Sequence, residues 1–174
     1  MANEVIDRDL GFKGLAAALG AMHQPGVLVG ILQDKGSFTT EEGITLAGYA
    51  AVNEFGSDDG RVPERSFLRS SVDDHAAEYA AELDKIAGDT IDAAIRDPAQ
   101  GKAIGVLERG LGRLGARAAR DVQTKIREGG EPFIENAPYT LERKYPANRP
   151  LIHTGRMRQS ISFVTDMDGK GTSR

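Results

Sequence analysis

The residue types that could do chemistry are scattered through this chain of 174 residues. Its histidines, His23, His75 and His153, are isolated and lack metal-ligand spacing, which favours structural or surface roles for all three. Asp58-Asp59 and Asp73-Asp74 are adjacent acidic pairs, and adjacent carboxylates on a chain point in different directions. Acid–base catalysis needs groups held by a packed site. The sequence therefore predicts no catalytic centre, no metal site and no cofactor, and it indicates that the protein is not an enzyme.

Glycines within a helical pattern could suggest a phosphate-binding loop. The pattern matches neither the dinucleotide fingerprint nor the P-loop, which would need a Lys-Ser/Thr pair. In a helix, each glycine costs roughly 1 kcal/mol relative to alanine. Close packing against another helix, or a helix that bends during assembly, explains these glycines better than phosphate binding. They are Gly105, Gly110, Gly112 and Gly115.

A stripe of arginines is the best candidate for a functional surface. Four-residue steps advance about 40° around a helix, so the stripe projects opposite to Leu107, Leu111 and Leu114. Its members are Arg109, Arg113, Arg117 and Arg120. A solvated face paired with the acidic first part of the chain is the favoured interpretation. The alternatives are a contact between subunits or the basic lining of a DNA channel, for which non-specific phosphate contacts would suffice.

Composition narrows the class of protein. Hydrophobic residues make up 40% and charged residues 28%, as in soluble globular domains, and cysteine is absent. Neither a signal peptide nor an apolar run of membrane length is recognisable, so synthesis in a cytoplasm is expected. Residues 1–100 carry 8 Lys and Arg against 18 Asp and Glu, whereas residues 101–174 carry 14 against 8. The two parts can complement each other within one chain or between copies. The net charge of −4 argues against a dedicated nucleic-acid binder.

Hydrophobic spacing predicts the elements of the first part of the chain. A short amphipathic helix is expected over residues 9–22, and the apolar run Val27–Leu32 predicts a strand inside a sheet. A second helix should begin at a capping box of Thr39 and Glu42 and stop at Gly56. Its expected apolar face consists of Ile44, Ala47, Ala51, Val52 and Phe55.

Two long helices are predicted next. The first should have Ser71 as its N-cap and stop near residue 96. Its expected core face is Val72, Ala76, Tyr79, Leu83 and Ile86, continued by Ile91, Ala94 and Ile95. The second should start at Asp97-Pro98 and end at Gly129-Gly130. Its expected core face is Leu107, Leu111, Leu114, Ala118 and Val122. An antiparallel hairpin and a bent rod are both compatible with the sequence.

The last part of the chain is rich in proline. Residues 131–150 hold four prolines, and twenty residues without secondary structure are uncommon in a compact domain. An extended arm that orders against partners is therefore expected. A helical turn capped by Thr154, a strand over Ser160–Thr165 and a disordered tail at 166–174 should follow. The predicted fold class is α+β, a small antiparallel or mixed sheet packed with two long helices and shorter helices, in one domain of residues 1–165.

Three segments, taken in order, resemble a phage protein family. They are Tyr49–Gly56 (YAAVNEFG), Val62–Leu68 (VPERSFL) and Arg149–Ser162 (RPLIHTGRMRQSIS). This set is similar to the head–tail connector, neck and tail-completion proteins of tailed bacteriophages, a group that includes relatives of minor tail protein Z. The resemblance covers roughly residues 27–165. Ser66 and His153 stand where proline and aspartate are common in the family pattern, and these departures concern packing or turns.

The resemblance implies a virion structural protein at the head–tail junction or the top of the tail. Such proteins form homo-oligomeric rings, usually in multiples of six, so a hexamer or dodecamer around the DNA channel is expected. Neighbouring connector, tail-tube or tail-terminator proteins would be its partners, with no membrane and no cofactor. The expected interface residues are Phe55, Arg65, Phe67, Leu68, Leu151, Ile152, Arg156 and Arg158. The same residues could instead close the fold of a single chain.

Two other hypotheses remain at this point. The protein could be a tail terminator or a transient assembly factor that is absent from the finished particle. A hypothesis of another class is a DNA-binding regulator that uses the Arg109–Arg120 stripe. The regulator would bind free DNA with steep salt dependence, whereas a ring component would bind free DNA poorly.

Overall fold

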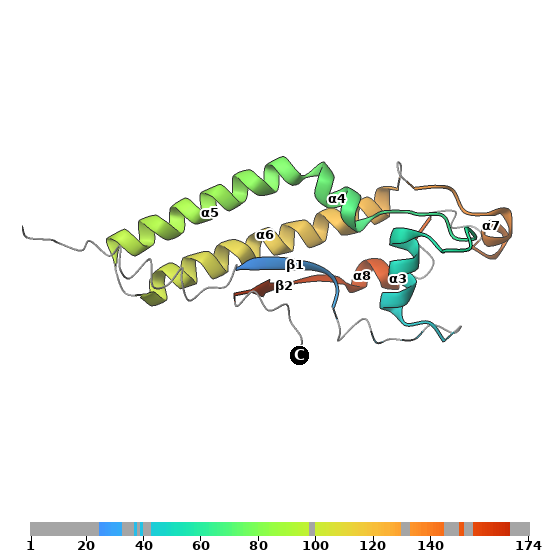
Figure 1. Cartoon of the computed structure of the whole chain (residues 1–174), viewed down its shortest axis with the longest axis horizontal. Coiled ribbons are helices and arrows are strands. Elements are labelled where there is room, and N and C mark those ends of the chain that lie inside the picture. Colours follow the sequence, from blue (N-terminus) through green and yellow to red (C-terminus); the bar gives the residue numbers. More distant parts are fainter. Residues whose placement is uncertain are drawn as a thin grey trace, which may run out of the picture. The chain divides into compact units, whose positions relative to one another are not determined.

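The computed structural model describes residues 25–32, 37, 39, 43–97, 100–129, 133–144, 150–151 and 155–167 (Figure 1). The elements in chain order are β1 (Gly26–Ile31), α3 (Leu46–Phe55), α4 (Leu68–Asp74), α5 (Ala76–Arg96), α6 (Gln100–Glu128), α7 (Pro138–Lys144), α8 (Arg156–Ser160) and β2 (Ile161–Asp166). The fold is α+β, as predicted. The helix expected over residues 9–22 and nearly all of the expected tail lie outside the described residues.

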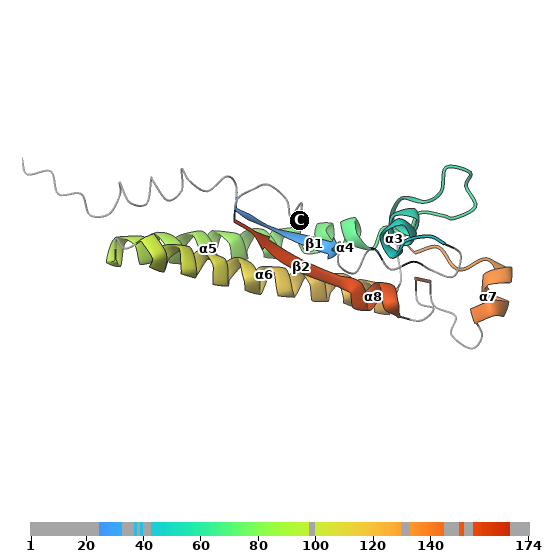
Figure 2. The ribbon, with the colours of Figure 1, turned by 90° about the horizontal axis from the view of Figure 1, so that it is seen from below.

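The sheet is small, because β1 pairs with β2 in an antiparallel two-stranded ribbon (Figure 2). Both strands lie where alternation and apolar runs predicted them. The prediction that β1 would lie inside a sheet was wrong for the part of the chain that the structure describes, since β2 is the strand's sole partner there. One face of β1 is covered through Val29 and Ile31, whereas Leu28 is exposed.

The chain divides into two compact units, and the boundary between them falls inside α6. Unit 1 comprises Met1–Val27, Glu78–Leu114 and Thr165–Arg174, and unit 2 comprises Leu28–Ala77 and Gly115–Val164. Each has its own buried cluster. The cluster of unit 1 consists of Ile86, Leu107, Leu111 and Leu114. The cluster of unit 2 consists of Leu46, Ala50, Phe67, Ala119, Val122, Ile126, Leu151, Met157 and Ile161.

Within unit 1, α5 and the first half of α6 form an antiparallel hairpin (Figures 1 and 2). Helix α5 ends at Arg96 and α6 runs from Gln100 to Glu128, close to the predicted bounds, and Gly129 follows with a φ of +68°. Pro98 lies outside the described residues. The predicted core face of α6 is also confirmed, because all its members are buried. Gly110 brings the helices close together: a Cβ there would lie 2.7 Å from Ile86 Cγ2. Close helix packing, as predicted, accounts for this glycine.

The prediction for the first long helix was wrong in two respects. The chain forms two helices, because α4 ends at Asp74 and His75 leaves helical geometry before α5 begins. Ser71 is therefore no N-cap but a fully buried residue inside α4. In addition, only some of the residues that were predicted to face the core do so. Tyr79, Ile86 and Ala94 face inward, whereas Val72, Ala76, Leu83, Ile91 and Ile95 are exposed.

Helix α3 begins later than predicted, and it buries a different face from the one that was predicted. Its N-cap is Thr45, whose Oγ1 accepts a hydrogen bond from the amide of Gly48 at 3.1 Å. Thr39 instead forms an isolated bridge to Thr45, and Glu42 lies outside the described residues. The face predicted to be buried is exposed throughout. The buried residues of α3 are Leu46, Ala50, Asn53 and Glu54.

The predicted arm has more structure than expected. Residues 133–137 belong to unit 2, in which Phe133 packs against the buried cluster and Asn136 is buried. Helix α7 follows directly, beginning at Pro138, a residue suited to a first helical turn. At least this part of the arm is thus ordered against its own chain.

We expect Gly110→Ala to lower the free energy of unfolding by about 1–3 kcal/mol, because the new methyl group would overlap Ile86, which cannot move away without displacing α5. Gly112→Ala is the matched control, since a Cβ there meets nothing within 4 Å. This substitution should stabilise the protein by up to about 1 kcal/mol through helix propensity. The free energies of unfolding of the two variants are compared by urea denaturation, monitored by circular dichroism. Equal stabilisation by both would contradict the close approach of α5 and α6.

Candidate interaction surfaces and the cluster that positions them

A buried carboxylate joins residues 49–56 to residues 62–68, two of the three segments singled out in the sequence. Glu54, near the end of α3, is 5% exposed. Its Oε1 accepts hydrogen bonds from Ser66 Oγ at 2.8 Å and from the amide of Arg69 at 2.9 Å. Its Oε2 accepts hydrogen bonds from the amides of Phe67 at 2.8 Å and Leu68 at 2.9 Å. Each carboxylate oxygen therefore accepts two hydrogen bonds.

The three amides belong to the start of α4. The first amides of a helix have no partner inside the helix, and the helix dipole makes this end favourable for an anion. The residue before α4, Phe67, has no side chain that could serve as a cap. Glu54 supplies the cap from another helix, 12–15 residues earlier in the chain. This long-range cap replaces the Ser71 cap that was predicted from local spacing.

The loop between α3 and α4 is held by hydrogen bonds among its own residues and to α3. Gly56 has φ +80°, and a Cβ there would lie 3.2 Å from both Val62 O and the Glu64 amide nitrogen. The amide of Ser57 donates to Val62 O at 2.9 Å, and the amide of Arg65 donates to Asn53 O at 2.8 Å. Asp59 accepts from Ser57 Oγ at 2.7 Å, which lowers the pKa of that carboxyl. Glycine is thus required at position 56 by both conformation and space.

A buried arginine holds the base of the arm. Arg65 is 7% exposed, and its Nε donates to Ile134 O at 2.7 Å while Nη2 donates to Glu135 O at 3.1 Å. Burial lowers the pKa of the Arg65 guanidinium from its ordinary value, an effect that Tyr49 partly offsets. Two donors in a fixed planar fork set both the position and the orientation of the arm's backbone.

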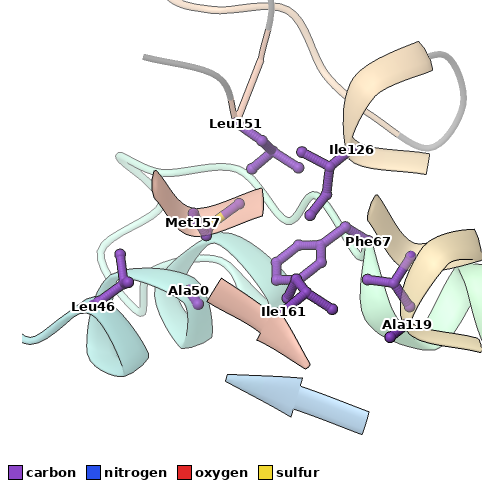
Figure 3. Packing of buried hydrophobic residues seen from close by; sticks show 9 residues of the cluster. Leu46, Ala50, Phe67, Ala119, Ile126, Leu151, Met157 and Ile161 are labelled. Carbon is purple, nitrogen blue, oxygen red and sulfur yellow. The ribbon is translucent and has the colours of Figure 1, made fainter. Parts of the chain in front are cut away.

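The third segment completes the cluster of unit 2. Figure 3 shows Phe67 close to Ile161, with Ile126 and Ala119 of α6 on the other sides of its ring. Leu151 and Met157 belong to the same cluster. Gln123 Nε2 also donates to Ile161 O at 3.1 Å, which ties β2 to α6. The three segments therefore meet in one buried cluster.

The structure divides the predicted interface residues into two groups. Arg65, Phe67 and Leu151 are buried, and Leu68 packs partly buried against the cluster. These residues close the fold of their own chain, the alternative that the sequence left open. Phe55 and Arg156 are exposed, and Arg158 is half-buried. Ile152 lies outside the described residues.

The arginines of α6 face away from the buried leucines, as predicted. Arg109, Arg113 and Arg120 are exposed, whereas Arg117 is half-buried and its Nε lies 3.7 Å from Asp121 Oδ2. Arg117 is thus paired within its own helix. The other three remain candidates for contact with an anionic surface.

Helix α3 presents an apolar outer face that sequence reasoning had assigned to the core. Phe55 is 71% exposed, Ile44 46% and Val52 38%, and Ala47 and Ala51 lie between them. Ala47, Ala51 and Phe55 each follow a buried residue of α3 by one position, a rotation of about 100°. The sequence predicted this face to be buried, whereas the structure buries the adjacent face of Leu46, Ala50, Asn53 and Glu54.

Other kinds of site are not evident where the structure describes the chain. Among the described residues, no group of three His, Cys, Asp or Glu side chains could hold a metal ion. Of the histidines, His75 is described, and its Nδ1 lies 2.8 Å from Ser71 O. None of the described helices is both long enough and apolar enough to cross a membrane.

The chain was compared with models of protein families, with curated proteins and with solved structures, and none of the three comparisons finds a match.

We expect Glu54→Ala to lower the free energy of unfolding by about 3 kcal/mol or more, because it leaves the buried donors of residues 66–69 without an acceptor. Glu54→Gln should cost about 1–2 kcal/mol, since one oxygen remains. The control is Glu64→Ala, which removes an exposed partner of Arg69 and should cost about 1 kcal/mol or less. Chemical denaturation measures all three. An Ala variant at position 54 as stable as the control would refute the long-range cap.

Arg65→Lys should loosen the base of the arm, because lysine cannot reproduce the two-pronged contact with Ile134 O and Glu135 O. We expect hydrogen exchange over residues 133–137 to accelerate about tenfold. Mass spectrometry of peptides from this segment measures the change. Arg69→Lys is the control, because Arg69 is exposed and contacts Glu64 rather than the arm. Equal exchange in both variants would show that Arg65 does not hold the arm.

Proposed function

We propose that this protein is a virion structural protein of a tailed bacteriophage, acting in head–tail joining or tail completion as a ring-forming component of the neck around the DNA channel. It acts by assembly and not by catalysis. Its partners are further copies of itself and the neighbouring connector, tail-tube or tail-terminator proteins.

One observation carries the proposal. The three segments that resemble the connector family are separated in sequence, yet their residues meet in one unit. Glu54 of the first segment caps α4, which begins at Leu68, the last residue of the second segment. Met157 and Ile161 of the third pack in the same cluster as Phe67. The resemblance therefore follows a connected structural unit rather than isolated matches, which supports a shared fold.

The exposed surfaces are also consistent with a role in assembly. Large apolar side chains that remain accessible on a chain often mark contacts with other proteins. Here such side chains include those on the outer face of α3 and on the arm, where Ile134 and Tyr139 are 57% and 67% exposed. Helix α5 exposes others, among them Ile95 at 57%. A ring component needs two such surfaces on each copy, one for each neighbour.

The DNA-binding regulator remains a second candidate, because three arginines of α6 are exposed. It requires the purified protein to bind free duplex DNA with an affinity that falls steeply as salt rises. Replacing Arg109, Arg113 and Arg120 by glutamine should then abolish binding. A ring component should instead show weak binding that these substitutions scarcely change.

The decisive experiment disrupts the gene in the phage or prophage that encodes the protein. We expect lysates imaged by negative-stain electron microscopy to contain DNA-filled heads beside separate tails, because the two cannot be joined. Complementation with the wild-type gene is the control and should restore joined particles. Normal infectious particles without the gene would refute the structural role and favour the regulator. Heads without any tails would place the protein in tail assembly, and its presence in purified virions would separate a permanent component from a transient factor.

A further inference from the structure

Helix α5 carries a second apolar stripe beside its inward side. The inward side consists of the half-buried Tyr79 and Glu82 and the buried Ile86, Thr90 and Ala94. The residue after each of them lies about 100° further around the helix and is exposed. This outer stripe of α5 consists of Ala80, Leu83, Ala87, Ile91 and Ile95. An ordinary surface helix buries its apolar stripe, so the exposed one marks a contact with another molecule.

The first half of α6 exposes a face with room for another helix. This outer face of α6 lies opposite to the buried leucines and consists of Lys102, Gly105, Arg109, Gly112 and Arg113. A Cβ at Gly112 would meet nothing within 4 Å, and one at Gly105 would meet only the end of the Arg109 side chain, at 3.2 Å. No other helix of the described chain comes within 4 Å of these two Cβ positions. A side chain of a neighbouring helix can therefore approach α6 closely here.

The described side chains of α5 and of the unit 1 part of α6 carry opposite net charge. Helix α5 has five acidic residues and two basic ones, namely Glu78, Glu82, Asp84, Asp89, Asp92, Lys85 and Arg96. The unit 1 part of α6 has one acidic residue and three basic ones, namely Glu108, Lys102, Arg109 and Arg113. Among the described residues, Asp84, Arg109 and Arg113 form no ion pair. Charges that are free within the chain and opposite in sign suit a contact between copies.

From these observations we propose that the outer stripe of α5 is the docking surface for the outer face of α6 in a second copy of this chain. The α5 of a second copy would bring acidic side chains to an acidic helix, whereas its α6 brings basic ones. The segments Leu83–Ile95 and Lys102–Arg113 are about 18 and 17 Å long, so they match over about three turns. Because two different surfaces are joined, the contact is heterologous and repeats from copy to copy, closing into a ring when the rotation allows. The inference deepens the proposed ring function and rests on it for its biological role.

Apolar and charged side chains have different roles in this contact. The large residues of the outer stripe provide the apolar area that leaves water, and they supply most of the affinity. Exposed ion pairs add little affinity, so the pairing of Asp84 and Asp92 with Arg109 and Arg113 of the neighbouring copy selects the partner and the register. Asp92 is available for this pairing, because its contact with Arg96 in its own helix is exposed.

Charge reversal in the purified full-length protein tests the choice of partner surface. The α5 variant carries Asp84→Lys with Asp92→Lys, and the α6 variant carries Arg109→Glu with Arg113→Glu. In sedimentation velocity at low salt, we expect the wild type to form oligomers and each variant alone to associate about tenfold more weakly, because its two surfaces then carry the same sign. An equimolar mixture of the two variants should associate as the wild type does, since each contact between unlike variants joins opposite charges.

Three outcomes of this experiment would overturn the proposal. One is an α6 variant that associates as strongly as the wild type, which is expected for a contact between two α5 helices or for arginines that serve only DNA. The second is a mixture that associates no better than either variant alone. The third is a wild-type protein that is monomeric at all concentrations. Thermal melting by circular dichroism verifies that both variants fold.

The apolar part of the contact is tested by Ile91→Glu, which we expect to weaken self-association by about thirtyfold or more. Val72→Glu is the matched control, because Val72 is 41% exposed against 43% for Ile91 but lies on α4 in unit 2. It should associate as the wild type does. An equal effect of the two substitutions would contradict a contact at the outer stripe of α5.

The absence of native cysteine allows a direct test of proximity. With a short bismaleimide, Ala87→Cys mixed with Gly105→Cys should give mixed crosslinked dimers in excess over either symmetric dimer. Predominance of symmetric dimers would overturn the proposal. These measurements are independent of the phage experiment. Oligomers that use this contact in a protein dispensable for head–tail joining would refute the proposed function alone, whereas a joining protein without the contact would refute this inference alone.

Discussion

The burial of the Glu54 carboxylate is the constraint on which unit 2 depends. A charged side chain removed from water is costly unless hydrogen bonds replace the lost hydration. Here Ser66 Oγ and the amides of residues 67–69 provide them. These amides would themselves lack acceptors without Glu54, because they open a helix. The carboxylate of Glu54 and the first amides of α4 therefore supply each other's hydrogen-bond partners. For this reason α3 and α4 stabilise each other.

Several other features follow from that pairing. Once Glu54 is inside, Phe67 is placed in the cluster with Ile161 and the second half of α6. The backbone of Arg65 is bonded to Asn53 O, and its side chain reaches the carbonyls of the arm. The outer side of α3 is left apolar and exposed. A single buried carboxylate thus links the core, the arm and the exposed apolar face of α3.

The two units use different means of holding helices together. In unit 1, apolar side chains of α6 pack on α5, and Gly110 permits the close approach. In unit 2, polar bonds to buried groups set the path of the chain around a larger apolar cluster. Apolar packing tolerates changes that keep volume and polarity, whereas a buried polar network tolerates the loss of few members. Residues 49–56 and 62–68 lie in the second kind of environment.

The sequence by itself determined the fold class, the bounds of α6 with its buried leucines, and both strands, because these depend on local periodicity and on Pro and Gly signals. Only the tertiary structure decided that Glu54 caps α4, that α3 exposes the face expected inside, and that the arm base docks on Arg65. Helix α3 has apolar residues on both sides, so spacing alone could not select the covered one. Bonds between residues 12–15 or about 70 positions apart made that choice.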